Sequence, residues 1–267
     1  MRQDKKNCQA NAQMLYLDHL LKRLKPWRIA YGLHERNGKM KIVLLNTSAR
    51  KNGATSRILT GFSETLSAKP GVETTFMHLS DLRIGFCSGC CLCYKNGVCH
   101  IGDDADMLSE LLDNADGVII GTPNYVGNVS GQLKTFIDRG HFVMEQLMKD
   151  KYTVGVVTYE NTLGGAALKV LRNLFVFSGA KGYSGLVVKT PFGSDPLASQ
   201  KVKAKVTRMA EKFYKSIRDK KAGPPINRIL QSFAFNIVIK PFVLRKGDQF
   251  DGVLKHWSKR GINYERR

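Results

Sequence analysis

The chain has 267 residues, of which 43% are hydrophobic and 24% are charged, and this balance excludes a disordered or collagen-like protein. No apolar run reaches the roughly 18–20 residues that a membrane span needs, so we expect no membrane span. The first residues lack the apolar core of a signal peptide. We therefore expect a cytoplasmic protein whose thiols are reduced unless they bind metal.

The net charge of +20 is concentrated at the two ends of the chain, 1–40 and 191–267, while residues 41–190 are almost neutral. An evenly basic protein would indicate nucleic-acid binding. The basic ends carry no recognition motif and no interleaved aromatic residues, so we expect no nucleic-acid partner. The pattern instead indicates a globular domain with basic additions.

Apolar segments alternate with helical patterns from residue 40 onward. We expect strands at 41–46, 72–79, 116–121, 152–158 and 183–189. Between them we expect helices at 55–66, 103–114, 130–148 and 163–177. This alternation predicts an α/β fold, a doubly wound five-stranded parallel sheet with helices on both faces and right-handed crossovers.

The expected organisation has three parts. Residues 1–39 form an N-terminal helical extension, with an amphipathic helix at 13–25. Residues 40–190 form the α/β domain, which includes a cysteine-rich loop at 87–99. Residues 191–267 form a basic C-terminal helical extension, with a helix at 197–220. A segment rich in Phe and Ile follows, which we expect either to cover a ligand or to pack against a second subunit.

The loop after the first strand carries hydroxyls and a cation, and it leads into a helix. Ligands of open α/β sheets bind beyond the carboxyl ends of the strands, and a helix N-terminus favours a phosphate. The sequence lacks both GxGxxG and GxxxxGK[ST], which argues against an NAD-binding domain of that type and against a P-loop nucleotidase. The alternative interpretation is a polar strand-to-helix connection that binds no ligand. The candidate phosphate-binding residues are Thr47, Ser48, Arg50, Gly53, Thr55 and Ser56.

Two more loops follow the third and fourth strands. Pro123 restricts the residue before it to extended backbone, and the loop can present backbone groups and Tyr125 to a flat ring. The Gly164-Gly165 pair lets the backbone approach a ligand closely. A turn with a buried Tyr and a plain β/α connection are the alternatives. The candidate residues are Pro123, Asn124, Tyr125, Val126, Gly127, Asn128, Thr158, Tyr159, Glu160, Gly164 and Gly165.

Five of the six cysteines lie in the segment CSGCCLCYKNGVC, residues 87–99, while Cys8 is isolated. Three thiolates at x2 spacing with a fourth nearby suit a 4Fe-4S cluster. The candidate ligands are Cys87, Cys90, Cys93 and Cys99, with Cys91 as an extra. Structural zinc is a second interpretation and no metal a third.

The remaining polar residues give no indication of a binding or catalytic role. The histidines are scattered, and we expect no histidine site. Asp103 and Asp104 are expected to cap a helix, and Asp138 and Arg139 to form a partly buried pair.

The loops resemble those of the flavodoxin-like NAD(P)H-dependent FMN reductases over about residues 40–190. The first loop matches the S-x-R-x-x-G-x-T-S pattern from Ser48 to Ser56, although Asn46-Thr47 stands where many members have Gly or Ser. Residues 122–139 match T-P-x-Y-x-G-x-x-S-x-x-L-K-x-F-x-D-R, which is far more specific. The resemblance implies that the first loop binds the FMN phosphate and that the other two loops contact the flavin ring.

The cysteine spacing looks like that of the iron–sulfur flavoproteins of anaerobic microbes within this family. That resemblance implies an electron-transfer oxidoreductase that pairs FMN with a 4Fe-4S cluster. NAD(P)H or reduced ferredoxin is the implied donor, and quinone, O2 or peroxide, or another electron carrier, is the implied acceptor. It also implies a homodimer or homotetramer. The alternative is an FMN-dependent NAD(P)H:quinone or flavin reductase without a cluster.

Overall fold

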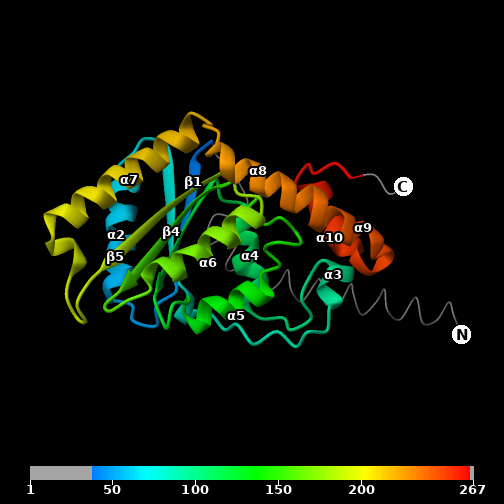
Figure 1. Cartoon of the computed structure of the whole chain (residues 1–267), viewed down its shortest axis with the longest axis horizontal. Coiled ribbons are helices and arrows are strands. Elements are labelled where there is room, and N and C mark those ends of the chain that lie inside the picture. The colour runs from blue at the N-terminus through cyan, green and yellow to red at the C-terminus, as the bar shows by residue number, and fades with distance from the viewer. Residues whose placement is uncertain (1–37, 265–267) are drawn as a thin grey trace, which may run out of the picture. The chain divides into compact units, whose positions relative to one another are not determined.

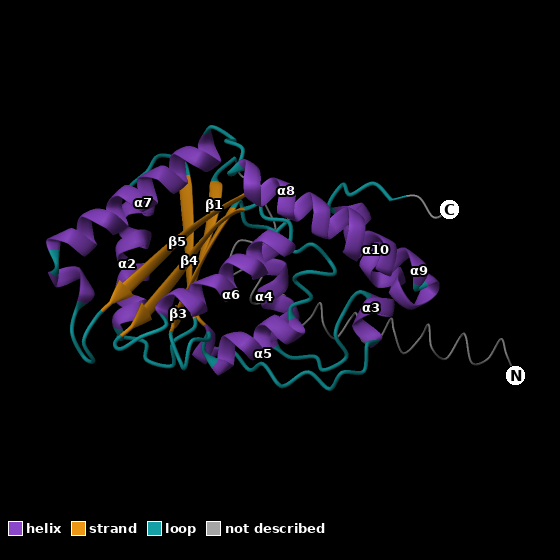
Figure 2. Cartoon of the chain, in the orientation of Figure 1, coloured by secondary structure: helices purple, strands orange, loops and turns teal. Residues whose placement is uncertain are grey.

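The computed structural model describes residues 38–264. Five strands form one parallel sheet in the order β2-β1-β3-β4-β5, drawn in orange in Figure 2. The strands are β1 (Met40–Asn46), β2 (Val72–His78), β3 (Gly117–Pro123), β4 (Tyr152–Tyr159) and β5 (Gly182–Lys189). This is the flavodoxin-like strand order, so the predicted fold class is confirmed. The expected helix at 13–25 and Cys8 lie outside the described residues.

The strand register places the carboxyl ends of β1, β3, β4 and β5 along one edge of the sheet. Asn46 pairs with Gly121, Pro123 with Thr158, and Tyr159 with Lys189. Every residue of β3 is buried, as expected for a central strand of a parallel sheet. The loops that follow these four strands therefore meet at a common edge.

One face of the sheet is covered by α2 (Ala54–Ser67) and α7 (Gln200–Arg218), which pack against each other. Each helix places apolar residues at helical spacing in the main core, among them Ile58, Phe62, Val206 and Phe213. A Cβ at Gly121 would lie 2.8 Å from Cδ1 of Leu59, so the glycine lets α2 approach β3 closely.

On the opposite side of the sheet, α6 (Gly164–Phe177) packs against β4 and β5. Figure 1 shows it beside α4 (Asp104–Asp113) and α5 (Gly131–Arg139). Asp103 caps α4 by accepting a hydrogen bond from the amide of Ala105, as predicted. Short 3-10 turns lie at Leu79–Asp81, Pro196–Ala198 and Gly247–Phe250.

The predicted helix at 130–148 is wrong in its second half. Helix α5 ends at Arg139, and turns follow through residue 150. The backbone φ of His141, Gln146 and Asp150 is 49°, 55° and 62°, and such left-handed angles cannot continue an α-helix. Phe142, Leu147 and Met148 of this segment are buried without being helical.

The C-terminal segment forms a second cluster of helices. Helix α8 (Pro225–Phe233) continues through a π-helical turn at Ala234–Ile239 into α9 (Lys240–Arg245), and α10 (Asp251–Lys259) follows. Apolar side chains of the π-helical turn, α9 and α10 form a second core together with Tyr94, Val143 and Met144. Tyr94 belongs to α3 (Leu92–Asn96), the short helix of the cysteine loop, and Figure 1 shows α3, α9 and α10 grouped together. The segment therefore packs against the cysteine loop.

Within residues 38–264, none of the helices combines the length and the apolar character that crossing a membrane requires.

Candidate functional site

A cavity of about 750 Å³ opens at the carboxyl edge of the sheet, where ligands of open α/β folds bind. It is formed by the loops after β1, β3, β4 and β5. The predicted binding residues that line it are Ser48, Arg50, Gly53, Thr55, Pro123, Asn124, Tyr125, Val126, Gly127, Thr158, Tyr159 and Glu160.

The first loop ends at the N-terminus of α2. Its N-cap residue is Gly53, which has no side chain to accept a hydrogen bond from the amides of the first turn. Ser48 Oγ accepts from the amide of Arg50 at 3.2 Å, and Thr55 Oγ1 lies 2.7 Å from Thr158 Oγ1. The loop is thus held against β4 while its helix amides remain available to an anion.

The second loop is a tight turn. Tyr125 and Asn128 exchange backbone hydrogen bonds of 3.0 Å in both directions. Between them the φ of Val126 is 51°, a costly angle for a β-branched residue. The side chain of Val126 is 96% exposed and that of Tyr125 is 51% exposed. Strained backbone with exposed apolar groups at a cavity wall is typical of a ligand-binding loop.

Asn124 supplies an unused hydrogen-bond acceptor in the cavity wall. Its Nδ2 donates to the carbonyl of Thr162 at 2.9 Å, which ties the second loop to the third. Its Oδ1 is buried and has no hydrogen-bond partner among the described residues. A buried acceptor without a partner is costly, and a bound ring with an N–H group removes that cost. The wall thus fits a heteroaromatic ligand such as a flavin.

The third loop is shaped by Gly164. A Cβ at this position would lie 2.6 Å from Cδ1 of Tyr159, so only glycine allows the ring to pack there. Leu163, just before it, has a φ of 64° and is 58% exposed at the cavity. Gly165 has open space around its Cα.

Five predicted binding residues lie outside the cavity lining: Thr47, Ser56, Asn128, Gly164 and Gly165. Thr47 instead joins two loops. Its Oγ1 donates to the carbonyl of Gly121 at 2.9 Å, and its own carbonyl accepts from Ser130 Oγ at 2.8 Å. Thr47 therefore fixes the first loop against the second.

A fourth loop, which follows β5, was not predicted from the sequence. Phe192 is 74% exposed there, and the guanidinium of Arg50 lies 4.3 Å from its ring centroid. The amide of Phe192 donates to Oε1 of Glu160 at 3.1 Å. The sequence feature that could have predicted this loop is the polar TPFGS segment directly after the last strand. Further lining residues that the analysis missed are Asn52, Ala54, Asn161, Thr162, Leu163, Thr190, Pro191, Phe192, Gly193 and Ser194.

The cysteine loop places its thiols in different surroundings. Cys87, Cys90 and Cys91 are exposed, Cys93 is half-buried and Cys99 is buried. Cys90 Sγ lies 3.2 Å from Nδ1 of His100. Thiols are the ligand type of an iron–sulfur cluster. Within residues 38–264, however, no group of three or more metal-binding side chains is gathered at one point.

Two of the histidines that are scattered in the sequence lie beside one carboxylate in the structure. His141 and His256 lie 2.8 Å and 3.4 Å from the two carboxylate oxygens of Glu145, next to the cysteine loop. Burial opposes protonation of His141, but the hydrogen bonds to Cys93 and Glu145 outweigh burial and raise its pKa to about 10.

The expected pair of Asp138 with Arg139 is also wrong. Arg139, which is 1% exposed, donates two 2.8 Å hydrogen bonds to the carboxylate of Asp103 and a third to the carbonyl of Gly85. Asp138 instead pairs with Lys134 on the surface of α5. The buried pair fixes the chain just before the cysteine loop.

Comparisons with known proteins show the family of the chain. The family model of the NADPH-dependent FMN reductases matches residues 40–193. An iron–sulfur flavoprotein of Clostridioides difficile is 34% identical over 84% of this chain and all of its own length. An iron–sulfur flavoprotein of Methanosarcina thermophila is 25% identical over 64% of this chain and 94% of its own length.

Solved structures share the fold. An NADH:FMN oxidoreductase in its apo form has a TM-score of 0.52 at 20% identity, covering 71% of this chain and 94% of its own. The NAD(P)H:quinone oxidoreductase of Methanothermobacter marburgensis has a TM-score of 0.53 at 14% identity, covering 66% and 98%. From the family match and the relatives, the chain belongs to the NADPH-dependent FMN reductase family, within its branch of iron–sulfur flavoproteins.

Proposed function

We propose that this flavin-dependent oxidoreductase binds FMN in the cavity at the carboxyl edge of the sheet. The observation that carries the proposal is the buried Oδ1 of Asn124, which lacks a partner within residues 38–264, in a wall that also holds the N-terminus of α2. The helix amides would hold the phosphate. When bound, FMN supplies hydride or single-electron transfer, and the protein orients it.

Within residues 38–264, Arg50 is the basic residue that lines the cavity. The Arg50→Ala variant is expected to weaken FMN binding by about 1–3 kcal/mol, because it removes a charge-assisted hydrogen bond. The measurement is a fluorescence titration of flavin-free protein with FMN. Lys51→Ala is the matched control, since Lys51 pairs with Asp81 and does not line the cavity. An Arg50→Ala variant with the wild-type Kd would contradict this placement of the phosphate.

The electron donor we propose is NAD(P)H or reduced ferredoxin. Tyr125 and Phe192 are exposed at the cavity, where a flat donor ring or a partner surface can reach the flavin. The test is anaerobic mixing of the FMN-loaded protein with NADH, NADPH or reduced ferredoxin. We expect at least one of these donors to reduce the flavin, which is seen as a loss of its visible absorbance. No bleaching by any of the three would contradict the proposal.

We propose that the cysteine loop binds a 4Fe-4S cluster through Cys87, Cys90, Cys93 and Cys99. The spacing of these cysteines supports the proposal, and so do the names of the relatives. The reducing conditions of the cytoplasm, where we place the protein, would keep the thiols available. Zinc is the competing occupant, and elemental analysis separates the two metals.

The basic C-terminal part offers a docking surface for an acidic electron carrier such as a ferredoxin. Helix α7 presents exposed Lys201, Lys203, Lys205 and Lys212. We expect the rate of reduction by ferredoxin to fall as salt rises, because screening weakens electrostatic steering. Stopped-flow rates at several salt concentrations measure this, and a rate that does not depend on salt would contradict it.

We also propose a homodimer or homotetramer. Apolar side chains stay exposed along α8 and the turn after it, at Ile226, Ile229, Phe233 and Ile237. Their i, i+3, i+7, i+11 spacing forms one stripe, which suits packing against a helix of a second copy. Analytical ultracentrifugation is expected to show a species of at least twice the chain mass, and a monomer would contradict the proposal.

A further inference from the structure

The C-terminal helix α10 meets the cysteine loop at Gly97, the residue that ends α3. The φ of Gly97 is 80°, and its amide donates to the carbonyl of Cys93 at 2.7 Å. Gly252, in the first turn of α10, lies directly against it. A Cβ at Gly252 would be 2.1 Å from the nitrogen of Gly97 and 2.6 Å from its Cα. No side chain fits between the two backbones.

Two side chains extend this contact. Nε2 of His256, one turn further along α10, lies 2.7 Å from the carbonyl oxygen of Gly97, so it is the ring nitrogen that carries the proton. Tyr94 of α3 stacks on Phe250, with ring centroids 4.7 Å apart and an interplanar angle of 18°. Contacts from residues 250–256 therefore hold the middle and the C-terminal end of α3.

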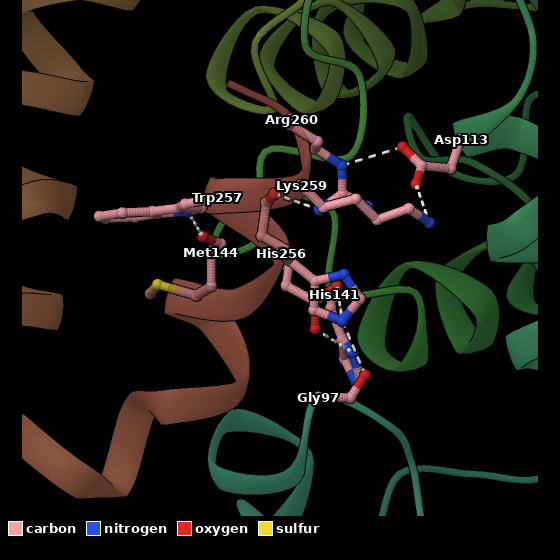
Figure 3. Close-up of polar contacts among 9 residues, drawn as sticks. Gly97, Asp113, His141, Met144, His256, Trp257, Lys259 and Arg260 are labelled. Atoms are coloured by element: carbon pink, nitrogen blue, oxygen red, sulfur yellow. Dashed lines mark hydrogen bonds and ion pairs between the residues drawn. The ribbon is translucent and has the colours of Figure 1, made fainter. Parts of the chain in front are cut away.

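Helix α10 is itself anchored to the α/β domain, as Figure 3 shows. The fully buried Trp257 donates its indole N–H to the carbonyl of Met144 at 2.7 Å. Arg260 donates to the carboxylate of Asp113 at 2.9 Å and to the carbonyl of Glu145 at 2.6 Å. These contacts attach α10 to the end of α4 and to the 141–145 turn.

The 141–145 turn also contacts the cysteine loop, so that α3 is held by this turn as well as by α10. The ring of His141 lies 6.2 Å from the ring of Tyr94, centroid to centroid. Nδ1 of His141 lies 2.8 Å from Oε1 of Glu145, and Oε2 of Glu145 lies 3.4 Å from His256. Helix α3 is thus held between α10 and this turn. The contacts extend from Tyr94 to Gly97, two residues before Cys99.

We infer that residues 250–260 are a clamp that positions the cysteine loop, with Gly252 and His256 as positioning residues. The clamp sets where Cys93 and Cys99 lie before any metal is bound. The role of the clamp in cluster binding rests on the proposed function of the loop. Its role in positioning the thiols of the metal-free protein is independent of that proposed function.

Thiol reactivity of the metal-free, FMN-loaded protein tests the clamp. Iodoacetamide labelling with peptide mass spectrometry gives a rate for each cysteine, and buried thiols react through local opening. Gly252→Ala and His256→Ala are expected to speed the labelling of Cys99 by about 5- to 150-fold, the effect of losing about 1–3 kcal/mol of contact. His256→Gln keeps a donor for the Gly97 carbonyl and should restore a slow rate. Lys255→Ala, an exposed change on the same helix, should label like wild type.

The FMN affinity of all four variants should equal that of wild type, since none of these positions lines the cavity. After reconstitution with iron and sulfide, Gly252→Ala and His256→Ala should hold less iron than His256→Gln and wild type. Wild-type labelling rates in Gly252→Ala and His256→Ala would overturn the clamp. If wild type itself holds no iron, the cluster proposal fails, while the labelling rates still decide the clamp. If Gly252→Ala does not fold, the two His256 variants decide it.

Discussion

Replacing Asp103 with asparagine is expected to lower the free energy of unfolding by about 3–5 kcal/mol, because it leaves the guanidinium of Arg139 buried without a counter-charge. Arg139 is 1% exposed and Asp103 is 13% exposed. Asparagine still caps α4, so the loss reports the ion pair and not the cap. Urea denaturation of the flavin-free variant and wild type measures the difference.

The matched control is Asp138→Asn, which breaks the exposed pair with Lys134 on α5. That change should cost less than about 1 kcal/mol, since surface pairs contribute little. Equal losses in the two variants would contradict the importance of the buried pair.

The contribution of Asp103 also depends on pH. Burial alone would raise its pKa, but the hydrogen bonds from Arg139 and from the amides of Gly85 and Ala105 hold the pKa below its ordinary value of 3.8. A carboxylate with a lowered pKa stabilises the fold fully above that ordinary value, and the contribution is lost as the pH falls through the lowered pKa. The difference between wild type and Asp103→Asn should therefore shrink only in strong acid.

The second large effect concerns the cysteines. Alanine at any one of Cys87, Cys90, Cys93 and Cys99 is expected to abolish the cluster, because four-cysteine ligation needs four converging sulfurs. Iron content should fall, and the broad visible absorption that a cluster adds to the flavin spectrum should disappear. FMN should stay bound in every variant, since none of these cysteines lines the cavity.

Cys91→Ala is the control within the same loop. Adjacent cysteines direct their side chains differently, so Cys90 and Cys91 do not both serve one small cluster, and Cys90 keeps the regular x2 spacing. Cys91→Ala is expected to retain both iron and FMN. If it loses iron while Cys90→Ala keeps it, the ligand assignment is wrong although the cluster stands.

The strands could be predicted from sequence because central parallel strands are continuous apolar runs, which leave little freedom in position. The end of α5 could not. The apolar residues from Phe142 to Met148 fit a helical spacing, but the positive φ of His141 and Gln146 shows that they lie in turns, with Phe142, Leu147 and Met148 buried. Periodicity reports which side chains are buried and does not report the backbone that buries them.

Parts of the cavity could be predicted where a sequence motif marks them, or where a strand ends at the carboxyl edge of the sheet. The loop after β5 satisfies the second condition, yet its TPFGS segment matched no motif and was missed. The clamp could not be predicted from the sequence for a different reason. Gly97 and His256 are 159 positions apart, so no local pattern links them. The pairing of Asp103 with Arg139 was missed likewise, since these residues come from different helices.

The most direct test of the central claim is cofactor analysis of protein purified without oxygen. Denaturation is expected to release FMN in amounts equal to the protein chain, and the same sample is expected to hold iron and acid-labile sulfide in equal amounts. Iron-free protein that still releases FMN would contradict the cluster and leave a flavin reductase without one. Release of FAD, or of no flavin even after reconstitution with FMN, would contradict the assignment of the cavity itself.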